Sequence, residues 1–214
     1  MRSALLLAGI AAAAFAVRGF VAVPRAVPSA SMRPALEPGD YVLVTRWDYR
    51  RRLPARGDVV VFRAPDGGDY VKRVIGLPGD RVASTGGALS IAGRPLPRFR
   101  IADYIAPGGI AHVPRYRELA GDRRWSVLDG GRTARDDFQA VTVPSGHLFL
   151  LGDNRDDSLD SRFAATEGGI GMVPAAALVG RVRRVVFATD GRATLWNPLS
   201  WTRAARPERI GAAP

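Results

Sequence analysis

Cysteine is absent from the 214 residues, lysine occurs once and histidine occurs twice. The absence of cysteine excludes disulfide bonds, thiolate metal ligands and a cysteine nucleophile. His112 lies in an irregular section and His147 directly follows a turn, so both are expected to be surface or turn residues. Arginine supplies nearly all of the positive charge and is effectively never deprotonated. Lys72 is therefore the one side-chain amine that could serve as a base near neutral pH.

The overall composition, with 47% hydrophobic and 24% charged residues, is typical of a globular protein. A formal net charge of +11 suits nucleic acid, anionic lipid or an acidic partner. The sequence contains no zinc-finger spacing, no RNP-like strand and no basic run interleaved with aromatic residues. We therefore expect no nucleic-acid partner.

The N-terminal segment is apolar enough to enter a membrane. Residues 4–17 carry no charge, Arg18 interrupts the run, and residues 19–23 are again apolar. About 20 residues cross a hydrocarbon core of ~30 Å. This favours an uncleaved anchor over residues 1–23, in which Arg18 reaches the headgroups. A cleaved secretory signal, with its small-residue site at residues 11–14, is the alternative.

The remainder of the chain has the pattern of β-strands. Pro24, Pro28 and Pro34 prevent the helix from continuing. Short β-branched runs bounded by Gly, Pro and Asp follow at residues 41–46, 58–63, 70–75, 147–151 and 178–188. The predicted fold class is therefore mainly β, with antiparallel sheets and one N-terminal transmembrane helix.

The glycine-rich middle of the chain has weak periodicity and predicts a β-rich subdomain inserted into the main domain. Two tryptophans near the C-terminus, in LWNPLSW, suit either a membrane interface or a core-packing turn. The expected divisions are an anchor at 1–23, the main β domain at 24–82 and 144–195, the inserted subdomain at 83–143, and a membrane-proximal tail at 196–214.

A serine-containing motif, PSASMRP, begins at Pro28 and places Ser31 just after the apolar segment. Serines beside prolines are usually turn residues. A serine hydroxyl becomes an effective nucleophile only when a base removes its proton. The motif alone therefore does not identify a nucleophile.

Lys72 lies in the alternating strand YVKRVIGLPGD. To act as a base, its pKa must fall by several units from ~10.4, which requires burial. Val71, Val74 and Ile75 could provide apolar surroundings. An exposed strand lysine in a chain with a coding bias toward arginine is an equally good interpretation.

The run GDNRDDSLDSR, at residues 152–162, combines four aspartates with two arginines. Asp156, Ser158, Asp160 and Glu167 have the spacing of a calcium loop, but Ser161 replaces the required glycine and a strand precedes the run. We therefore expect no metal. A charge network that fixes a tight loop, and that could hold Ser158 against Lys72, is the favoured interpretation.

Together these segments resemble bacterial signal peptidase I, a family of serine peptidases with a Ser/Lys dyad. PSASMRPALEPGDYVLV is similar to the family's serine box and YVKRVIGLPGDRV to its lysine box. RGDVVVF is similar to the strand between them, and GDNRDDSLDSR followed by VPAAALVGRV to its closing box. The similarity covers residues 20–81 and 143–187 in the family's order.

The resemblance implies a role for each matching residue. Ser31 corresponds to the nucleophile, Lys72 to the general base and Ser158 to the hydroxyl that orients the lysine. Ser29 and the Ser31 backbone N–H correspond to the donors of the oxyanion hole. Structural polar positions are matched by Asp153, Arg155, Asp160 and Arg162, and positions near the substrate pocket by Met32 and Tyr70.

The function implied is removal of signal peptides from secretory preproteins with small residues at positions −1 and −3. No cofactor is expected, and the protein is expected to be a monomer in contact with membrane lipid. Its location would be the bacterial cytoplasmic membrane, single-pass, with the catalytic domain on the extracytoplasmic side. A peptidase dedicated to one conjugation or pilus substrate, or a non-enzymatic anchored binding protein, are the alternatives.

Overall fold

The computed structural model describes residues 22–46, 49, 52–106, 109, 112–190 and 198–214. Strands account for most of the regular secondary structure in this part of the chain, and every pairing between its named strands is antiparallel. The mainly β, antiparallel fold class predicted from the sequence is thus confirmed. No helix among the described residues has the length and apolarity to cross a bilayer.

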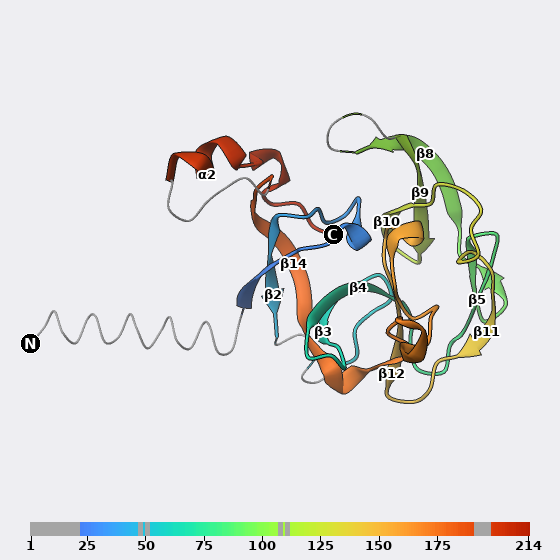
Figure 1. The fold of residues 1–214 in the computed structure, drawn as a ribbon. Helices are drawn as coiled ribbons and strands as arrows, with labels where there is room; N and C mark the ends of the chain where they lie inside the picture. Colours follow the sequence, from blue (N-terminus) through green and yellow to red (C-terminus); the bar gives the residue numbers. More distant parts are fainter. Residues whose placement is uncertain (1–21, 47–48, 50–51, 107–108, 110–111, 191–197) are drawn as a thin grey trace, which may run out of the picture.

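A seven-stranded sheet occupies the centre of the molecule (Figure 1). In spatial order it contains β1 (Ala22–Ala26), β2 (Asp40–Thr45), β14 (Leu178–Ala188), β3 (Val59–Arg63), β4 (Asp69–Gly76), β12 (His147–Leu151) and β13 (Val173–Pro174). Five of these strands lie within one residue of a predicted run. Strand β2 alternates buried and half-buried residues, whereas the first four residues of β3, Val59–Phe62, form an unbroken apolar run buried on both faces.

Two smaller sheets are built from the chain between β4 and β12 and lie beside the central sheet (Figure 1). One contains β10 (Arg123–Leu128), β9 (His112–Ala120) and β8 (Arg98–Ile105). The other contains β11 (Phe138–Thr142), β5 (Arg81–Thr85), β6 (Ala88–Ile91) and β7 (Arg94–Pro95). The predicted β-rich character of this section agrees with these strands.

Short helices complete the described part of the chain. They are the 3-10 helices η1 (Ala30–Met32), η3 (Arg155–Asp157), η4 (Ala165–Glu167), η5 (Ala175–Ala177) and η6 (Pro207–Arg209), and the α-helix α2 (Pro198–Ala204). Helix α2 includes the second of the two C-terminal tryptophans. The first one, at residue 196, lies outside the described residues.

The N-terminal boundary requires a correction. We predicted that the anchor extends through residue 23, but residues 22 and 23 belong to β1, which pairs with β2. Pro24 lies within β1. An edge strand tolerates a proline, which lacks a backbone N–H, because one side of the strand forms no ladder hydrogen bonds. The proline was interpreted as a break, and this strand was therefore missed. The rest of the predicted anchor, residues 1–21, lies outside the described residues.

Strand β4 lies where the apolar clusters of the core meet. Val71 packs against a cluster that contains Met32 and Val42, Val74 belongs to a second cluster, and Ile75 belongs to a third. The side chains of β4 are buried from Lys72 to Gly76. A polar side chain in this strand is consequently held in a tightly packed environment.

Candidate active site

Ser31 lies in η1, and the run that follows β12 holds this short helix in place. The Asn154 backbone N–H donates a hydrogen bond to the Ser31 carbonyl at 3.0 Å, and Asn154 Nδ2 donates to the Ala30 carbonyl at 3.3 Å. Met32 is 1% exposed and packs among the apolar residues of the core. These contacts fix the backbone on both sides of the Ser31 side chain.

Lys72 approaches Ser31 from strand β4, where it pairs with Val60 of β3. Its Nζ lies 2.8 Å from Ser31 Oγ, within hydrogen-bond distance. The whole lysine is only 4% exposed. The two residues are 41 positions apart in the chain, so the contact depends on the packing of η1 against the sheet.

Burial lowers the pKa of the Lys72 ammonium below its ordinary value of 10.5, because the charged form loses its hydration. The carboxylates of Asp160 and Asp153 oppose this effect, and the guanidinium of Arg162 adds to it. The net effect favours the neutral amine, which is the form that can accept a proton.

The lowered pKa predicts how cleavage depends on pH. If Lys72 is the base, kcat/KM rises as the pH increases through the folded-state pKa of this residue, which lies below 10.5, and is lost as the pH falls through it. The exposed carboxylate of Asp157 also raises this pKa, so Asp157→Asn should move the acid limb to lower pH. A pH profile of kcat/KM measures both effects.

Asp103→Asn, which changes a half-buried carboxylate of β8, should leave that limb in place. Cleavage that is independent of pH below 10.5 would contradict a base with a lowered pKa.

Two further serines lie near this pair. Ser29 Oγ is 3.1 Å from Ser31 Oγ, and either hydroxyl can donate. The Ser31 N–H is in the first turn of η1, and amide groups in the first turn of a 3-10 helix have no carbonyl partner within the helix. The role of the Ser29 hydroxyl and the Ser31 N–H as oxyanion donors stays a prediction.

Ser158 lines the same cavity and is 2% exposed, but its Oγ has no hydrogen-bond partner in the part of the chain that the structure describes. The predicted contact with Lys72 is not formed in this geometry. Its role in orienting the lysine stays a prediction.

The charged residues of the 152–162 run pair differently from what the sequence suggests. Asp160 and Arg162 do pair with each other, at 2.8 and 2.9 Å. Asp153 and Arg155 pair with residues outside the run. Asp153 accepts two hydrogen bonds from Arg73, at 2.7 and 2.6 Å.

Arg155 donates two hydrogen bonds to Glu118, at 2.8 and 2.6 Å. All four of these side chains in the two outside pairs are buried. The loop is therefore attached to both β4 and β9.

Sequence reasoning missed three residues that hold the site together. Gly152 has no room for a side chain, because an added Cβ would lie 2.3 Å from Ser158 Oγ and 2.6 Å from the Ser31 carbonyl. The other two residues are Arg73, which directly follows Lys72 in β4, and Glu118, which lies in β9. An arginine directly after Lys72 in an apolar strand would have been a usable sequence signal, whereas the sequence around Glu118 gives none.

The cavity at Ser31 has a volume of about 640 Å³. Its lining includes both predicted pocket residues, Met32 and Tyr70, and also Leu159 and Arg135. Tyr70 is at the rim, where its hydroxyl donates to Asp66 at 2.7 Å. Apolar walls beside a few convergent polar groups are typical of a ligand site.

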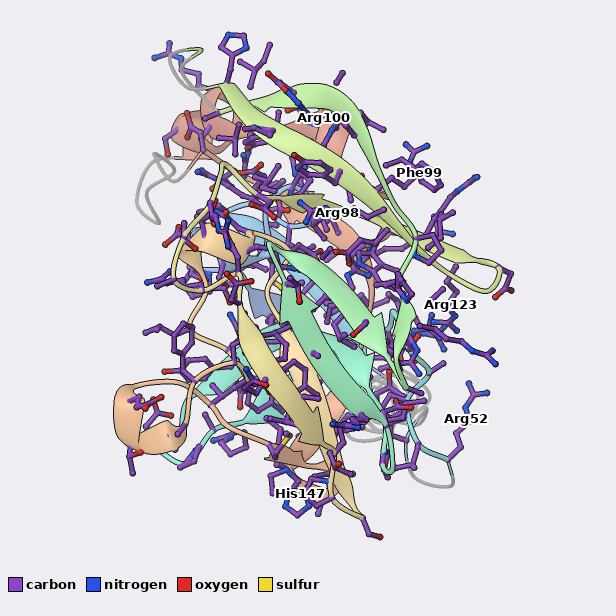
Figure 2. The ribbon with its side chains drawn as sticks, turned by 90° about the vertical axis from the view of Figure 1, so that its right-hand side faces the viewer. Arg52, Arg98, Phe99, Arg100, Arg123 and His147 are labelled. Carbon is purple, nitrogen blue, oxygen red and sulfur yellow. The ribbon has the colours of Figure 1, made fainter. Side chains whose placement is uncertain are left out.

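Neither histidine lines this cavity. His112 is exposed at the start of β9. His147 opens β12 at the end of the molecule opposite Arg100 and Phe99 of β8 (Figure 2). The sequence expectation that both are surface or turn residues agrees with these positions.

The calcium-loop alternative is not supported by the arrangement of its residues. Asp160 is paired with Arg162, while Asp156 lies with Asp129 and Asp136, their oxygens within 4.8 Å of one another. Asp129 in turn accepts a hydrogen bond from Arg98 at 2.6 Å. A guanidinium therefore already provides positive charge at this carboxylate cluster.

A buried amine within hydrogen-bond distance of a serine hydroxyl is one of the arrangements that can activate a serine as a nucleophile. This geometry is compatible with a serine peptidase. The model of the family described as "Signal peptidase, peptidase S26" matches residues 1–187, and the chain belongs to this family.

Relatives of the chain carry the same family name. Signal peptidase I of Pseudomonas aeruginosa is 36% identical over 185 residues, covering 77% of this chain and 64% of the relative. Signal peptidase I of Rickettsia prowazekii is 29% identical over 215 residues, covering 86% and 78%. The match thus spans less than two thirds of the Pseudomonas protein.

Among solved structures, a signal peptidase I of Enterococcus faecalis has a TM-score of 0.37 and 29% identity, covering 61% of this chain and 97% of that one.

Proposed function

We propose that the protein is an endopeptidase that removes signal peptides from secretory preproteins by a Ser31/Lys72 dyad. The observation that carries this proposal is the 2.8 Å approach of a nearly fully buried lysine amine to the Ser31 hydroxyl. Membership of the signal peptidase family supports the substrate class.

The proposed acylation begins with the neutral Lys72 amine, which accepts the Ser31 proton as Oγ attacks the scissile carbonyl carbon. The Ser29 hydroxyl and the Ser31 N–H donate to the developing oxyanion. When the peptide bond breaks, the Lys72 ammonium gives its proton to the leaving amine, and the signal peptide stays attached to Ser31 as an ester. Removing one oxyanion donor typically lowers the rate by about 10²–10³-fold.

Deacylation uses the same groups in a second cycle. Lys72 accepts a proton from a water molecule, the hydroxide attacks the ester carbonyl, and the proton returns to Ser31 Oγ as the bond breaks. Asp153, Arg155, Asp160 and Arg162 act by positioning in this scheme, because their ion pairs hold the loop that contacts Ser31.

The proposed setting is the extracytoplasmic face of the bacterial membrane. The apolar run within residues 1–23 supports an anchor, and Ser31 follows Arg18 by only thirteen residues. The proposed partners are secretory preproteins and membrane lipid, with the protein acting as a monomer.

A preprotein assay tests the proposed substrate class. The full chain in detergent should cleave a preprotein with Ala at positions −1 and −3 after the −1 residue, as mass spectrometry of the products would show. Phe at position −1 should lower kcat/KM by at least about 10-fold, since discrimination by one side chain in a pocket is typically 10–200-fold.

Ser31→Ala provides the background rate of the same preparation. Cleavage at another bond, or equal cleavage of the Phe substrate, would contradict the proposed specificity.

A further inference from the structure

A second cavity, of about 500 Å³, lies beyond the active site, against the C-terminal residues. We refer to it as the arginine pocket. Its size is within the range of small-molecule sites. None of the described residues that line it is an aspartate or a glutamate, and five of them are arginines: Arg73, Arg115, Arg117, Arg124 and Arg209. The chain end approaches the segment after η1 at this place (Figure 1).

Three of the arginines share one face of the β9–β10 pair. The register pairs Arg115 with Leu128, Arg117 with Ser126, and Arg124 with Leu119. Paired residues in a sheet point to the same side, and alternate residues along a strand return to that side. The three guanidinium groups are thus presented together, while Trp125 and Val127 of the alternate positions are buried.

Two of the five arginines of the arginine pocket are paired with a carboxylate. Arg73 is paired with Asp153, and Arg209 with Asp40. Arg115 donates only through Nε, to the Ala102 carbonyl at 3.0 Å. For Arg117 and Arg124, both exposed, no carboxylate of the described chain lies within ion-pair distance.

We propose that the arginine pocket binds a phosphate-type anion, either a free phosphate compound or the phosphate of a lipid headgroup. Guanidinium groups bind phosphate through two parallel hydrogen bonds, which favours this chemistry over a simple halide. The Ser126 side chain is half-buried on the same face and adds a hydroxyl donor. This site goes beyond the proposed peptidase function and does not depend on it.

The pocket is also next to the catalytic elements. Pro34 and Ala35, which line it, follow Ser31 by three and four residues, and Arg73 follows Lys72 directly. Arg209 connects the two regions by donating to the Ala35 carbonyl at 3.1 Å. A bound anion would thus be in contact with the backbone that carries the nucleophile candidate.

Equilibrium titration with inorganic pyrophosphate tests the site in the full chain held in a non-ionic detergent. Wild type should show saturable binding of one equivalent, weakened by added salt. Arg117→Gln with Arg124→Gln should weaken binding by at least about 10-fold, because two charge-assisted contacts are lost.

Arg81→Gln with Arg94→Gln removes the same charge from exposed positions of β5 and β7 and should leave the affinity unchanged. Arg117→Lys with Arg124→Lys keeps the charge without the planar fork and should give an intermediate loss. Equal affinity in wild type and the Arg117/Arg124 Gln variant, or no saturable binding, would overturn the proposal.

Arginine footprinting with phenylglyoxal, an uncharged reagent, then identifies the source of the phosphate. Pyrophosphate in detergent should protect Arg117 and Arg124 but not Arg94. Protection in vesicles of phosphatidylglycerol, and not of phosphatidylcholine, would assign the site to a lipid headgroup. Protection by pyrophosphate alone would assign it to a soluble phosphate, and protection by neither would overturn the proposal.

Discussion

Replacing Lys72 with arginine is expected to lower kcat/KM for preprotein cleavage by about 10²–10⁴-fold, the usual contribution of a general base. Arginine keeps the positive charge and much of the side-chain length, but its guanidinium does not deprotonate near neutral pH. Lys72→Arg therefore removes the group that can accept a proton and keeps a side chain that carries positive charge. Initial rates of cleavage at several preprotein concentrations measure the effect.

Lys72→Met is the companion variant, since it removes the amine and fills the same space with an apolar side chain. The lowered pKa of Lys72 costs stability at pH values below 10.5, because the folded chain binds the lysine proton more weakly than the unfolded chain does. Lys72→Met should accordingly unfold at a temperature no lower than that of wild type. Activity retained in both variants would exclude Lys72 as the base.

Replacing Asp153 with alanine is expected to destabilise the protein by about 3–5 kcal/mol, because it leaves the buried Arg73 guanidinium without its carboxylate. The side chains of this pair are 2% and 1% exposed, so water does not replace the lost partner. The expected fall in Tm is about 6–20 °C for a chain of this size. Thermal unfolding of the full chain in detergent, followed by circular dichroism, measures it.

Asp103→Ala is the matched control, since it also removes one carboxylate from an arginine pair, but the Arg100–Asp103 pair is 49% and 34% exposed. An exposed pair is typically worth less than about 1 kcal/mol. A second variant, Arg73→Met with Asp153→Leu, should recover part of the lost stability because no buried charge is left unpaired. If Asp153→Ala and Asp103→Ala destabilise equally, the buried pair does not hold the loop.

Local sequence pattern was sufficient for five of the seven strands of the central sheet. The alternation in DYVLVT and the apolar run VVVF depend only on neighbouring residues, and the observed strands begin and end close to the predicted positions. Strand β1 was missed because Pro24 is unfavourable in most strands, and only the position of β1 at the sheet edge makes it acceptable.

For the site, the sequence limited the candidate bases by composition. A chain with one lysine, two histidines at expected surface or turn positions and no cysteine offers few groups that titrate near neutral pH. The resemblance to the signal peptidases then indicated which serine to examine. Neither argument tells how far the Lys72 amine lies from the Ser31 hydroxyl.

The tertiary structure alone decided which charged groups meet. Asp153 and Arg73 are 80 positions apart, and Arg155 and Glu118 are 37 apart, so their pairing could not be recognised from a local run of aspartates and arginines. The arginine pocket likewise requires β9, β10 and the C-terminal residues to come together.

The sequence by itself thus determined the β-rich class and the identity of Lys72 as the candidate base, because both depend on composition and near-neighbour periodicity. The 2.8 Å contact between Lys72 and Ser31, and the burial that lowers the lysine pKa, were decided by the folded chain. The physical reason is that strand order and register determine which distant side chains share a desolvated space.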